Sequence, residues 1–91
     1  MVLIAEQTSQ FHKDLRLAKR RGKDLRLIQK VMYEIIHEQL LDRKYKDHFL
    51  LGKWNEHREL HIQPDWLLIY KLQPQIKVVR FVRTGSHADL F

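Results

Sequence analysis

The chain has 91 residues, enough for a single domain, residues 1–91, with one hydrophobic core. Apolar residues form 44% of the chain and charged residues 31%, a composition that argues against disorder. The absence of cysteine excludes disulfides and thiolate metal sites, and it suits a reducing cytoplasm. Because the apolar run before Glu6 is too short for a secretion signal or a spanning helix, we expect neither secretion nor a membrane.

The formal net charge is +6, and most of the excess lies in the first 30 residues, which contain eight basic and three acidic residues. Basic surfaces attract polyanions because binding releases counterions, so this charge indicates nucleic acid, a ribonucleoprotein or an acidic protein as a partner. A solvated helical face that only keeps the protein soluble is the alternative interpretation.

Residues 2–5 (VLIA) form a short apolar run that predicts a buried strand. Thr8 and Ser9 offer N-cap oxygens to a first helix, which Gly22 would end. Asp24 can cap a second helix. The apolar positions with helical period are Phe11, Leu15 and Ala18 in the first helix and Leu25, Ile28, Met32, Ile35, Ile36 and Leu40 in the second. The short connection predicts an antiparallel helical hairpin.

The second half of the chain predicts strands. Residues 42–57 have no sustained period and predict a long loop or a weak strand. Residues 58–62 and 66–72 flank a Gln-Pro-Asp turn, which is typical of a β-hairpin, and residues 76–84 predict a third strand. The element order β-α-α-β-β-β therefore predicts an α+β fold of two layers, with the N-terminal strand and the helical hairpin packed on an antiparallel sheet.

The hairpin strands predict two different faces. If Gln63 pairs with Trp66, an unbroken ladder places Ile62 opposite Leu67 and makes one face apolar, so that face should cover the helices. A bulge near the turn would rotate some of these side chains. The opposite face would collect an unusual mixture for a surface: Glu59, His61, Gln63, Trp66, Leu68 and Tyr70.

Six histidines invite a metal hypothesis, but their spacing matches no metal motif. Metal-free cleavage of RNA fits better, because the substrate supplies its 2′-hydroxyl as the nucleophile and the protein needs only a base, an acid and a cation. Histidines can divide the proton transfers near neutral pH, and aromatic residues can stack on bases. The candidate residues are His48, His61, Asp65, Trp66, Arg83, His87 and Phe91.

Three segments, YKDHFLLGKW (45–54), RELHIQPDWLLIYKL (58–72) and RTGSHADLF (83–91), closely resemble YafQ-type toxins of the RelE/ParE superfamily. The resemblance implies a ribosome-dependent endoribonuclease that cuts mRNA in the A site of the 70S ribosome without a cofactor. It also implies a ribbon-helix-helix antitoxin of the DinJ type as partner, with operator DNA reached only through the antitoxin complex.

The resemblance also implies residue roles. His87 would be the general acid that protonates the departing 5′-oxygen, and His61 with Asp65 the base and its orienting carboxylate. His48 would share the role of base or hold phosphate. The implied RNA-binding residues are Trp66 and Phe91, which would position bases, and Lys46 and Arg83, which would contact phosphate.

Other interpretations remain open from the residues alone. Trp66 could belong to the core, because tryptophan is usually buried, and Phe91 could anchor the C-terminus by packing. Phe49 stands where many members of the family have proline, which bears on loop stiffness. At the level of function, the alternatives are a ParE-like toxin that binds DNA gyrase without catalysis and a basic module that binds RNA or the ribosome.

Overall fold

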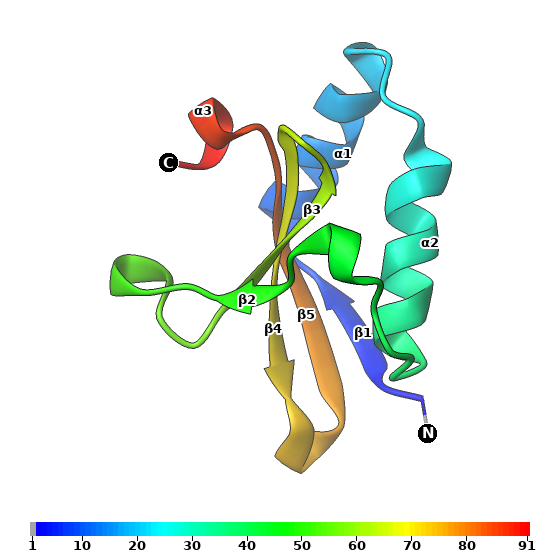
Figure 1. The fold of residues 1–91 in the computed structure, drawn as a ribbon, viewed down its shortest axis with the longest axis vertical. Coiled ribbons are helices and arrows are strands. Elements are labelled where there is room, and N and C mark those ends of the chain that lie inside the picture. Colours follow the sequence, from blue (N-terminus) through cyan, green and yellow to red (C-terminus); the bar gives the residue numbers. More distant parts are fainter. Residues whose placement is uncertain (1) are drawn as a thin grey trace.

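The structure, a computed structural model, describes residues 2–91. A five-stranded sheet, ordered β1-β5-β4-β3-β2, forms its centre (Figure 1). The strands are β1 (Ile4–Gln7), β2 (His48–Phe49), β3 (Arg58–Gln63), β4 (Trp66–Gln73) and β5 (Val78–Gly85). The helices are α1 (Ser9–Arg20), α2 (Leu25–Ile36) and α3 (His87–Leu90), with 3-10 turns η1 (Arg43–Tyr45), η2 (Gly52–Trp54) and η3 (Pro74–Ile76). The α+β fold is confirmed, but the sheet is mixed, because β1 pairs with β5 in parallel.

The helical hairpin forms as its capping residues predict. The Thr8 hydroxyl accepts a hydrogen bond from the Phe11 amide, and the Asp24 carboxylate accepts one from the Arg26 amide. Gly22 adopts a positive φ of 81° between the helices. The prediction that Leu40 continues the second helix was wrong: α2 ends at Ile36, and Leu40 is 97% exposed. No helix within residues 2–91 is long and apolar enough to cross a membrane.

The first strand also differs from its prediction. β1 begins at Ile4 rather than Val2, and its four residues are exposed. Leu3, just before the strand, is buried and belongs to the core. The physical reason is that β1 lies at the edge of the sheet, where it has a single neighbouring strand.

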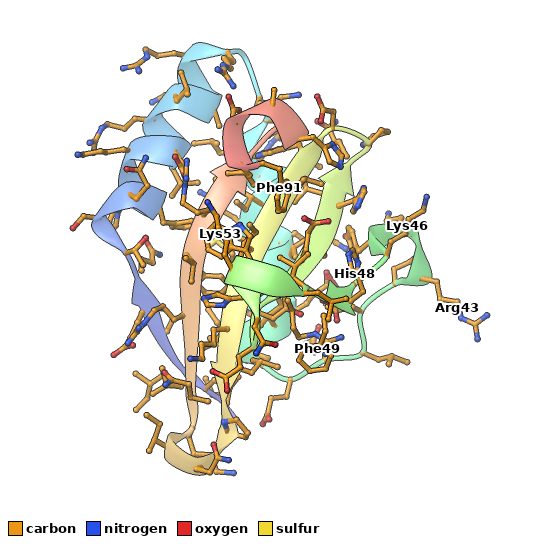
Figure 2. All side chains as sticks on the ribbon, turned by 90° about the vertical axis from the view of Figure 1, so that its left-hand side faces the viewer. Arg43, Lys46, His48, Phe49, Lys53 and Phe91 are labelled. Carbon is orange, nitrogen blue, oxygen red and sulfur yellow. The ribbon has the colours of Figure 1, made fainter. Side chains whose placement is uncertain are left out.

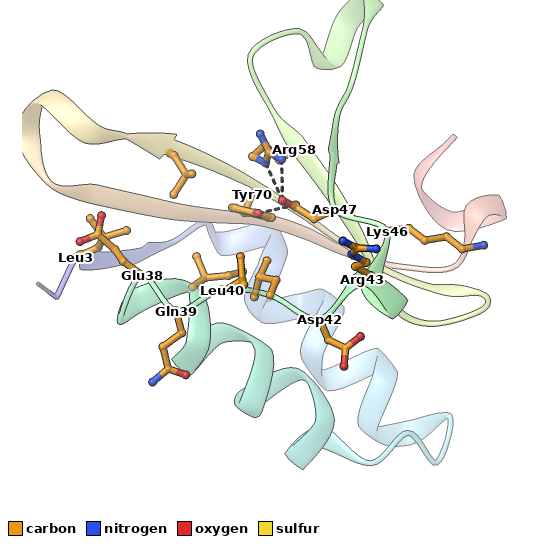
Figure 3. Close-up of a pocket in the computed structure, with 13 residues that line it drawn as sticks. Leu3, Glu38, Gln39, Leu40, Asp42, Arg43, Lys46, Asp47, Arg58 and Tyr70 are labelled. Atoms are coloured by element: carbon orange, nitrogen blue, oxygen red, sulfur yellow. Dashed lines mark hydrogen bonds and ion pairs between the residues drawn. The ribbon is translucent and has the colours of Figure 1, made fainter.

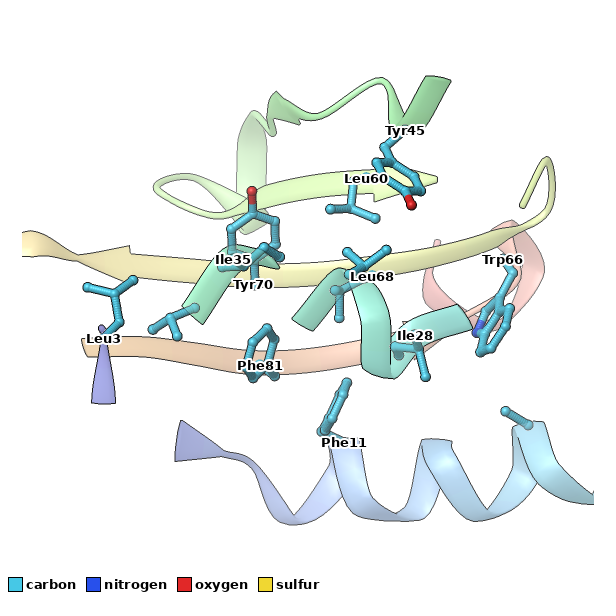
Figure 4. Packing of buried hydrophobic residues seen from close by; sticks show 13 residues of the cluster. Leu3, Phe11, Ile28, Ile35, Tyr45, Leu60, Trp66, Leu68, Tyr70 and Phe81 are labelled. Carbon is cyan, nitrogen blue, oxygen red and sulfur yellow. The ribbon is translucent and has the colours of Figure 1, made fainter. Parts of the chain in front are cut away.

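The main core lies between the helical hairpin and one face of the sheet, which we call the helix face (Figure 4). Phe11 from α1 stacks on Phe81 from β5 with ring centroids 5.9 Å apart. Ile28 and Val31 from α2 are also fully enclosed. The buried residues that this core receives from β3 and β4 are Leu60, Trp66, Leu68 and Tyr70.

The opposite face of the sheet, which we call the open face, carries a smaller cluster. Leu67 and Ile69 of β4 pack there against Leu90 of α3, with Leu50, Trp54 and Val82 around them. The segment 50–57 and α3 lie on the side away from α2 in Figure 1. Because β4 is covered on both faces, its apolar run does not alternate with polar residues.

The predicted faces of β4 were reversed. Gln63 pairs with Trp66 as expected, but the register shifts between His61 and Gln63, so Leu67 pairs with His61 instead of Ile62. A single extra residue in one strand exchanges the two faces of its partner beyond that point. Leu67 and Ile69 therefore face away from the helices, whereas Trp66, Leu68 and Tyr70 face them.

Trp66 is consequently a core residue, and its predicted role in stacking on a base does not fit the structure. Its side chain is 1% exposed, and its indole N–H donates a 3.0 Å hydrogen bond to the Thr84 hydroxyl. That hydroxyl in turn donates to the Leu67 carbonyl at 2.7 Å. Trp66 thus joins β4 to β5 from within the core.

Replacing Trp66 by phenylalanine should lower the free energy of unfolding by about 1–3 kcal/mol, because it removes apolar contacts and a buried hydrogen bond. Urea denaturation measures the change. Phe91→Leu is the control, because Phe91 is exposed and its replacement should leave the urea midpoint nearly unchanged. Equal midpoints for the Trp66 variant and the wild type would contradict the core assignment.

Candidate active site

Histidines from three different elements converge at one end of the open face. His48 lies on β2, His61 on β3 and His87 at the start of α3. The ring centroids of His48 and His61 are 6.4 Å apart, and those of His61 and His87 are 5.7 Å apart. The structure thus brings together three residues that span 39 positions of the sequence, from His48 to His87. His61 and His87 therefore lie side by side although they come from different elements.

Glu59 lies between two of these rings. Its side chain is 6% exposed, and its Oε1 lies 3.5 Å from Nε2 of His48 and 3.6 Å from Nε2 of His61. A carboxylate this buried requires compensation, and a proton on either imidazole would supply the opposite charge. The two-residue spacing predicted that Glu59 shares a strand face with His61, as observed, but the sequence assigned Glu59 no role.

The orientation of His48 is set by its own loop. Its Nδ1 lies 2.6 Å from the carbonyl oxygen of Lys46, and because a carbonyl only accepts, Nδ1 carries the proton. Lys46 has a φ of 53°, the left-handed conformation that turns the chain between η1 and β2. Nε2 of His48 is therefore the nitrogen that faces Glu59.

Asp65 pairs with His87 and not with His61, which corrects the predicted partnership. Its Oδ1 accepts hydrogen bonds from the His87 backbone N–H at 3.0 Å and from the His87 ring Nδ1 at 2.7 Å. These two hydrogen bonds hold the pKa of Asp65 below its usual value, and the bond from the backbone N–H has the larger effect. The ionised carboxylate fixes the proton on Nδ1 of His87 and leaves Nε2 for the substrate.

The short helix α3, which carries His87, is held at its first turn by a capping box. The Ser86 hydroxyl accepts from the Asp89 amide, and the Asp89 carboxylate accepts from the Ser86 amide. Arg21 at the end of α1 donates to the same carboxylate at 2.6 Å. A Cβ on Gly85 would lie 2.9 Å from the Asp89 carboxylate, so glycine is required for this close approach.

The remaining predicted residues divide into two groups. Lys46 and Phe91 are exposed, and Figure 2 shows Lys46, His48 and Phe91 on the side of the molecule that carries the open face. Arg83 is instead engaged by Asp14 of α1, with Nε at 2.8 Å from the carboxylate and only 25% of its side chain exposed. Its guanidinium therefore stabilises the junction of α1 and β5, and a contact with phosphate would have to compete with Asp14.

The arrangement suits proton transfer between a substrate and two separate histidines. Each of the outer rings has one nitrogen fixed by an acceptor, and the cluster opens to solvent, with the side chains of His48 and His87 48% and 54% exposed. Within residues 2–91, no group of three or more His, Asp or Glu side chains has the geometry to hold a metal ion.

Comparisons with known proteins agree with the fold. Residues 3–91 match the family model described as a bacterial toxin of type II toxin–antitoxin systems, YafQ. The mRNA interferase toxin YafQ of Escherichia coli K12 is 46% identical over 87 residues, which cover 94% of this chain and 92% of that protein.

Solved structures extend the comparison. The chain in the E. coli DinJ–YafQ toxin–antitoxin complex superposes with a TM-score of 0.91 at 42% identity, covering 100% of this chain and 99% of that one. A metal-bound toxin from Helicobacter pylori superposes with a TM-score of 0.91 at 43% identity, covering 98% and 99%. The fold and the matching family model thus define a bacterial toxin of the type II toxin–antitoxin class. The chain belongs to the YafQ family.

The stability of the protein should fall as the pH drops from about 4 to about 2. The Arg21 guanidinium and the Ser86 amide lower the pKa of Asp89 from 3.8 to about 2. Because the folded state holds the ionised form more tightly, this contribution is present above pH 4 and is lost as Asp89 becomes protonated. Urea denaturation between pH 5 and 2 should show a smaller decrease in Asp89→Asn than in the wild type. Identical slopes would contradict this role of Asp89.

Proposed function

We propose that the protein is an mRNA interferase that cleaves mRNA in the ribosomal A site, with the RNA 2′-hydroxyl as nucleophile and histidines as acid and base. The observation that carries the proposal is that His61 and His87 lie 5.7 Å apart, each beside its own carboxylate. The name of the E. coli relative, an mRNA interferase toxin, supports the same reaction class.

His87 is the proposed general acid. With Nδ1 bonded to Asp65, the protonated ring presents the N–H of Nε2 outward, where it can protonate the departing 5′-oxygen. The carboxylate stabilises the positively charged ring before the transfer and holds its orientation. More than half of the His87 side chain is exposed, so a substrate can reach it.

His61 is the proposed base, with Glu59 in place of the predicted Asp65 as its carboxylate partner. A neutral His61 can accept the 2′-hydroxyl proton, and Glu59 would balance the charge that the ring then acquires. His48 faces the same carboxylate and is the second candidate for this role. The acid and the base thus have separate carboxylates, so one ring can be charged while the other is neutral.

Substrate binding would use the exposed groups around the cluster. Lys46 can contact phosphate, and the exposed ring of Phe91 can stack on a base near His87. The excess positive charge of the helical hairpin would attract the ribosome and its mRNA. These roles require no metal ion or other cofactor.

The proposed partner is a ribbon-helix-helix antitoxin of the DinJ type. A structurally similar YafQ chain forms a toxin–antitoxin complex with DinJ. An antitoxin that covers the cluster or the basic hairpin would block access to mRNA, and operator DNA would be reached only through the complex.

Replacing His87 by alanine should reduce mRNA cleavage by about 10²- to 10⁴-fold, because the acid is lost. Folding and antitoxin binding should be retained, because the ring is exposed and contributes little to the core. Primer extension on mRNA from cells that express each variant measures cleavage and shows whether the cuts keep a fixed codon phase.

His37→Ala is the matched control, because His37 is a partly exposed histidine at the C-cap of α2, outside the cluster, whose ring contacts only Tyr33. A toxic His87→Ala variant that still cuts mRNA would refute the assignment. A wild-type protein that stops growth without any cuts would favour the gyrase-binding alternative.

Cleavage on purified ribosomes should be unchanged by a chelator selective for transition metals when magnesium is kept for the ribosome. The histidines themselves would transfer the protons, so the rate would not depend on a transition metal. This test is informative because a structurally similar H. pylori toxin is metal-bound. Loss of cleavage that one added metal ion restores would reject the metal-free mechanism.

A further inference from the structure

A second polar network lies on the helix face, directly behind the histidine cluster. Its centre is Asp47, the residue before His48 (Figure 3). Oδ1 of Asp47 accepts a 2.6 Å hydrogen bond from the Tyr70 hydroxyl, and Oδ2 accepts two hydrogen bonds from Arg58, at 2.7 and 3.0 Å. None of these three residues was assigned a role from the sequence, and Tyr70, which was predicted on the same face as His61, lies on the helix face.

The network is related to the cluster through the backbone. Pairing places His48 opposite Glu59 and Phe49 opposite Arg58, and Arg58 is in turn opposite Tyr70. Because neighbouring residues of a strand point to opposite faces, His48 and Glu59 lie on the open face while Arg58 and Tyr70 lie on the helix face. Two members of the network, Asp47 and Arg58, therefore directly precede two members of the site.

We propose that the Asp47–Arg58–Tyr70 network positions His48, and with it Glu59, for the reaction. The inference rests on the proposed function of the cluster, since it assigns positioning residues to that same site. β2 contains only two residues, so its own ladder holds His48 weakly. The Asp47 carboxylate supplies the missing attachment, because it ties the loop to β4, the most enclosed strand of the sheet.

The components suit a rigid attachment. Tyr70 is 2% exposed, and its burial, followed by its hydrogen bond to Asp47, raises its pKa, so the hydroxyl stays a donor at physiological pH. The two bonds from Arg58 restrict the rotation of the carboxylate. The guanidinium also lies over the Phe49 ring, 4.2 Å from its centroid, which fixes the residue that follows His48.

The network borders a cavity of about 560 Å³ between the end of α2, the 38–47 segment and the sheet. Its wall includes Leu3, Ile35, Leu41, Arg58 and Tyr70. Leu41 and Tyr45 pack the segment on the core at either end of this space, and Tyr45 is only 5% exposed. The hydrogen bonds of Asp47 add a second, polar restraint directly before His48.

The test compares Tyr70→Phe and Asp47→Asn with Ile28→Val, a core variant remote from the network. In Tyr70→Phe, the ring nitrogen resonances of His48 and their pH titration should change in two-dimensional NMR, with those of His87 unchanged. The single-turnover rate of mRNA cleavage should fall about tenfold. A displacement of a catalytic group by about 1 Å costs up to ~10²-fold, and the expected shift of His48 is smaller. Ribosome binding should keep the wild-type affinity.

Ile28→Val should alter neither the His48 resonances nor the rate, which separates positioning from a general loss of stability. Unchanged His48 resonances in both network variants would overturn the proposal, whatever their activity. Because the NMR measurement does not depend on RNA cleavage, it also distinguishes failure of this inference from failure of the proposed function. If Tyr70→Phe does not fold, Asp47→Asn provides the same comparison, and unfolding of both would show a structural network and reject a positioning role.

Discussion

The register shift in β3 between His61 and Gln63 is the constraint on which the site depends. Because Ile62 is left out of the ladder, Trp66 enters the core on the helix face instead of facing the histidines on the open face. The Trp66 indole is then fixed by the Thr84 hydroxyl near the end of β5. This hydrogen bond holds the turn that precedes Trp66 in place. Asp65 in that turn can therefore reach both the backbone and the ring of His87.

The two faces of the sheet serve different purposes, although the same strands contribute residues to both. The helix face supplies most of the buried area and the Asp47 network, and the open face carries the histidines. Alternation along β3 links the two faces, because Arg58 and Glu59 are adjacent but point in opposite directions. Adjacent residues of one strand can thus serve stability and chemistry separately, because their side chains lie on different faces.

The distribution of carboxylates explains why the protein combines ordered ion pairs with a basic surface. Asp14, Asp47, Asp65 and Asp89 each bind a cationic or imidazole partner at a junction between elements. These carboxylates are neutralised by their partners, and they position the loops and α3. The basic residues of the helical hairpin outnumber the acids left near them, so the outer surface retains the positive charge that a polyanionic partner requires.

The sequence by itself determined where the helices start and where the hairpin of β3 and β4 turns. Thr8 and Asp24 predicted the helix starts, and the Pro64 turn predicted the hairpin, because these signals are local. Motif resemblance also identified His48, His61, Asp65 and His87, residues that the structure gathers at one end of the sheet.

Only the tertiary structure decided which face each strand presents and which carboxylate serves which histidine. A bulge at Ile62 leaves no clear mark in the residue pattern of β4, since that strand is apolar on both faces. The pairing of Asp65 with His87, and of Glu59 with His61, depends on segments that meet through long-range packing. The sequence predicted that Arg83 contacts phosphate because it could not reveal the ion pair with Asp14. Asp14 lies on a helix 69 positions away, and the residue pattern of a strand carries no sign of such a partner.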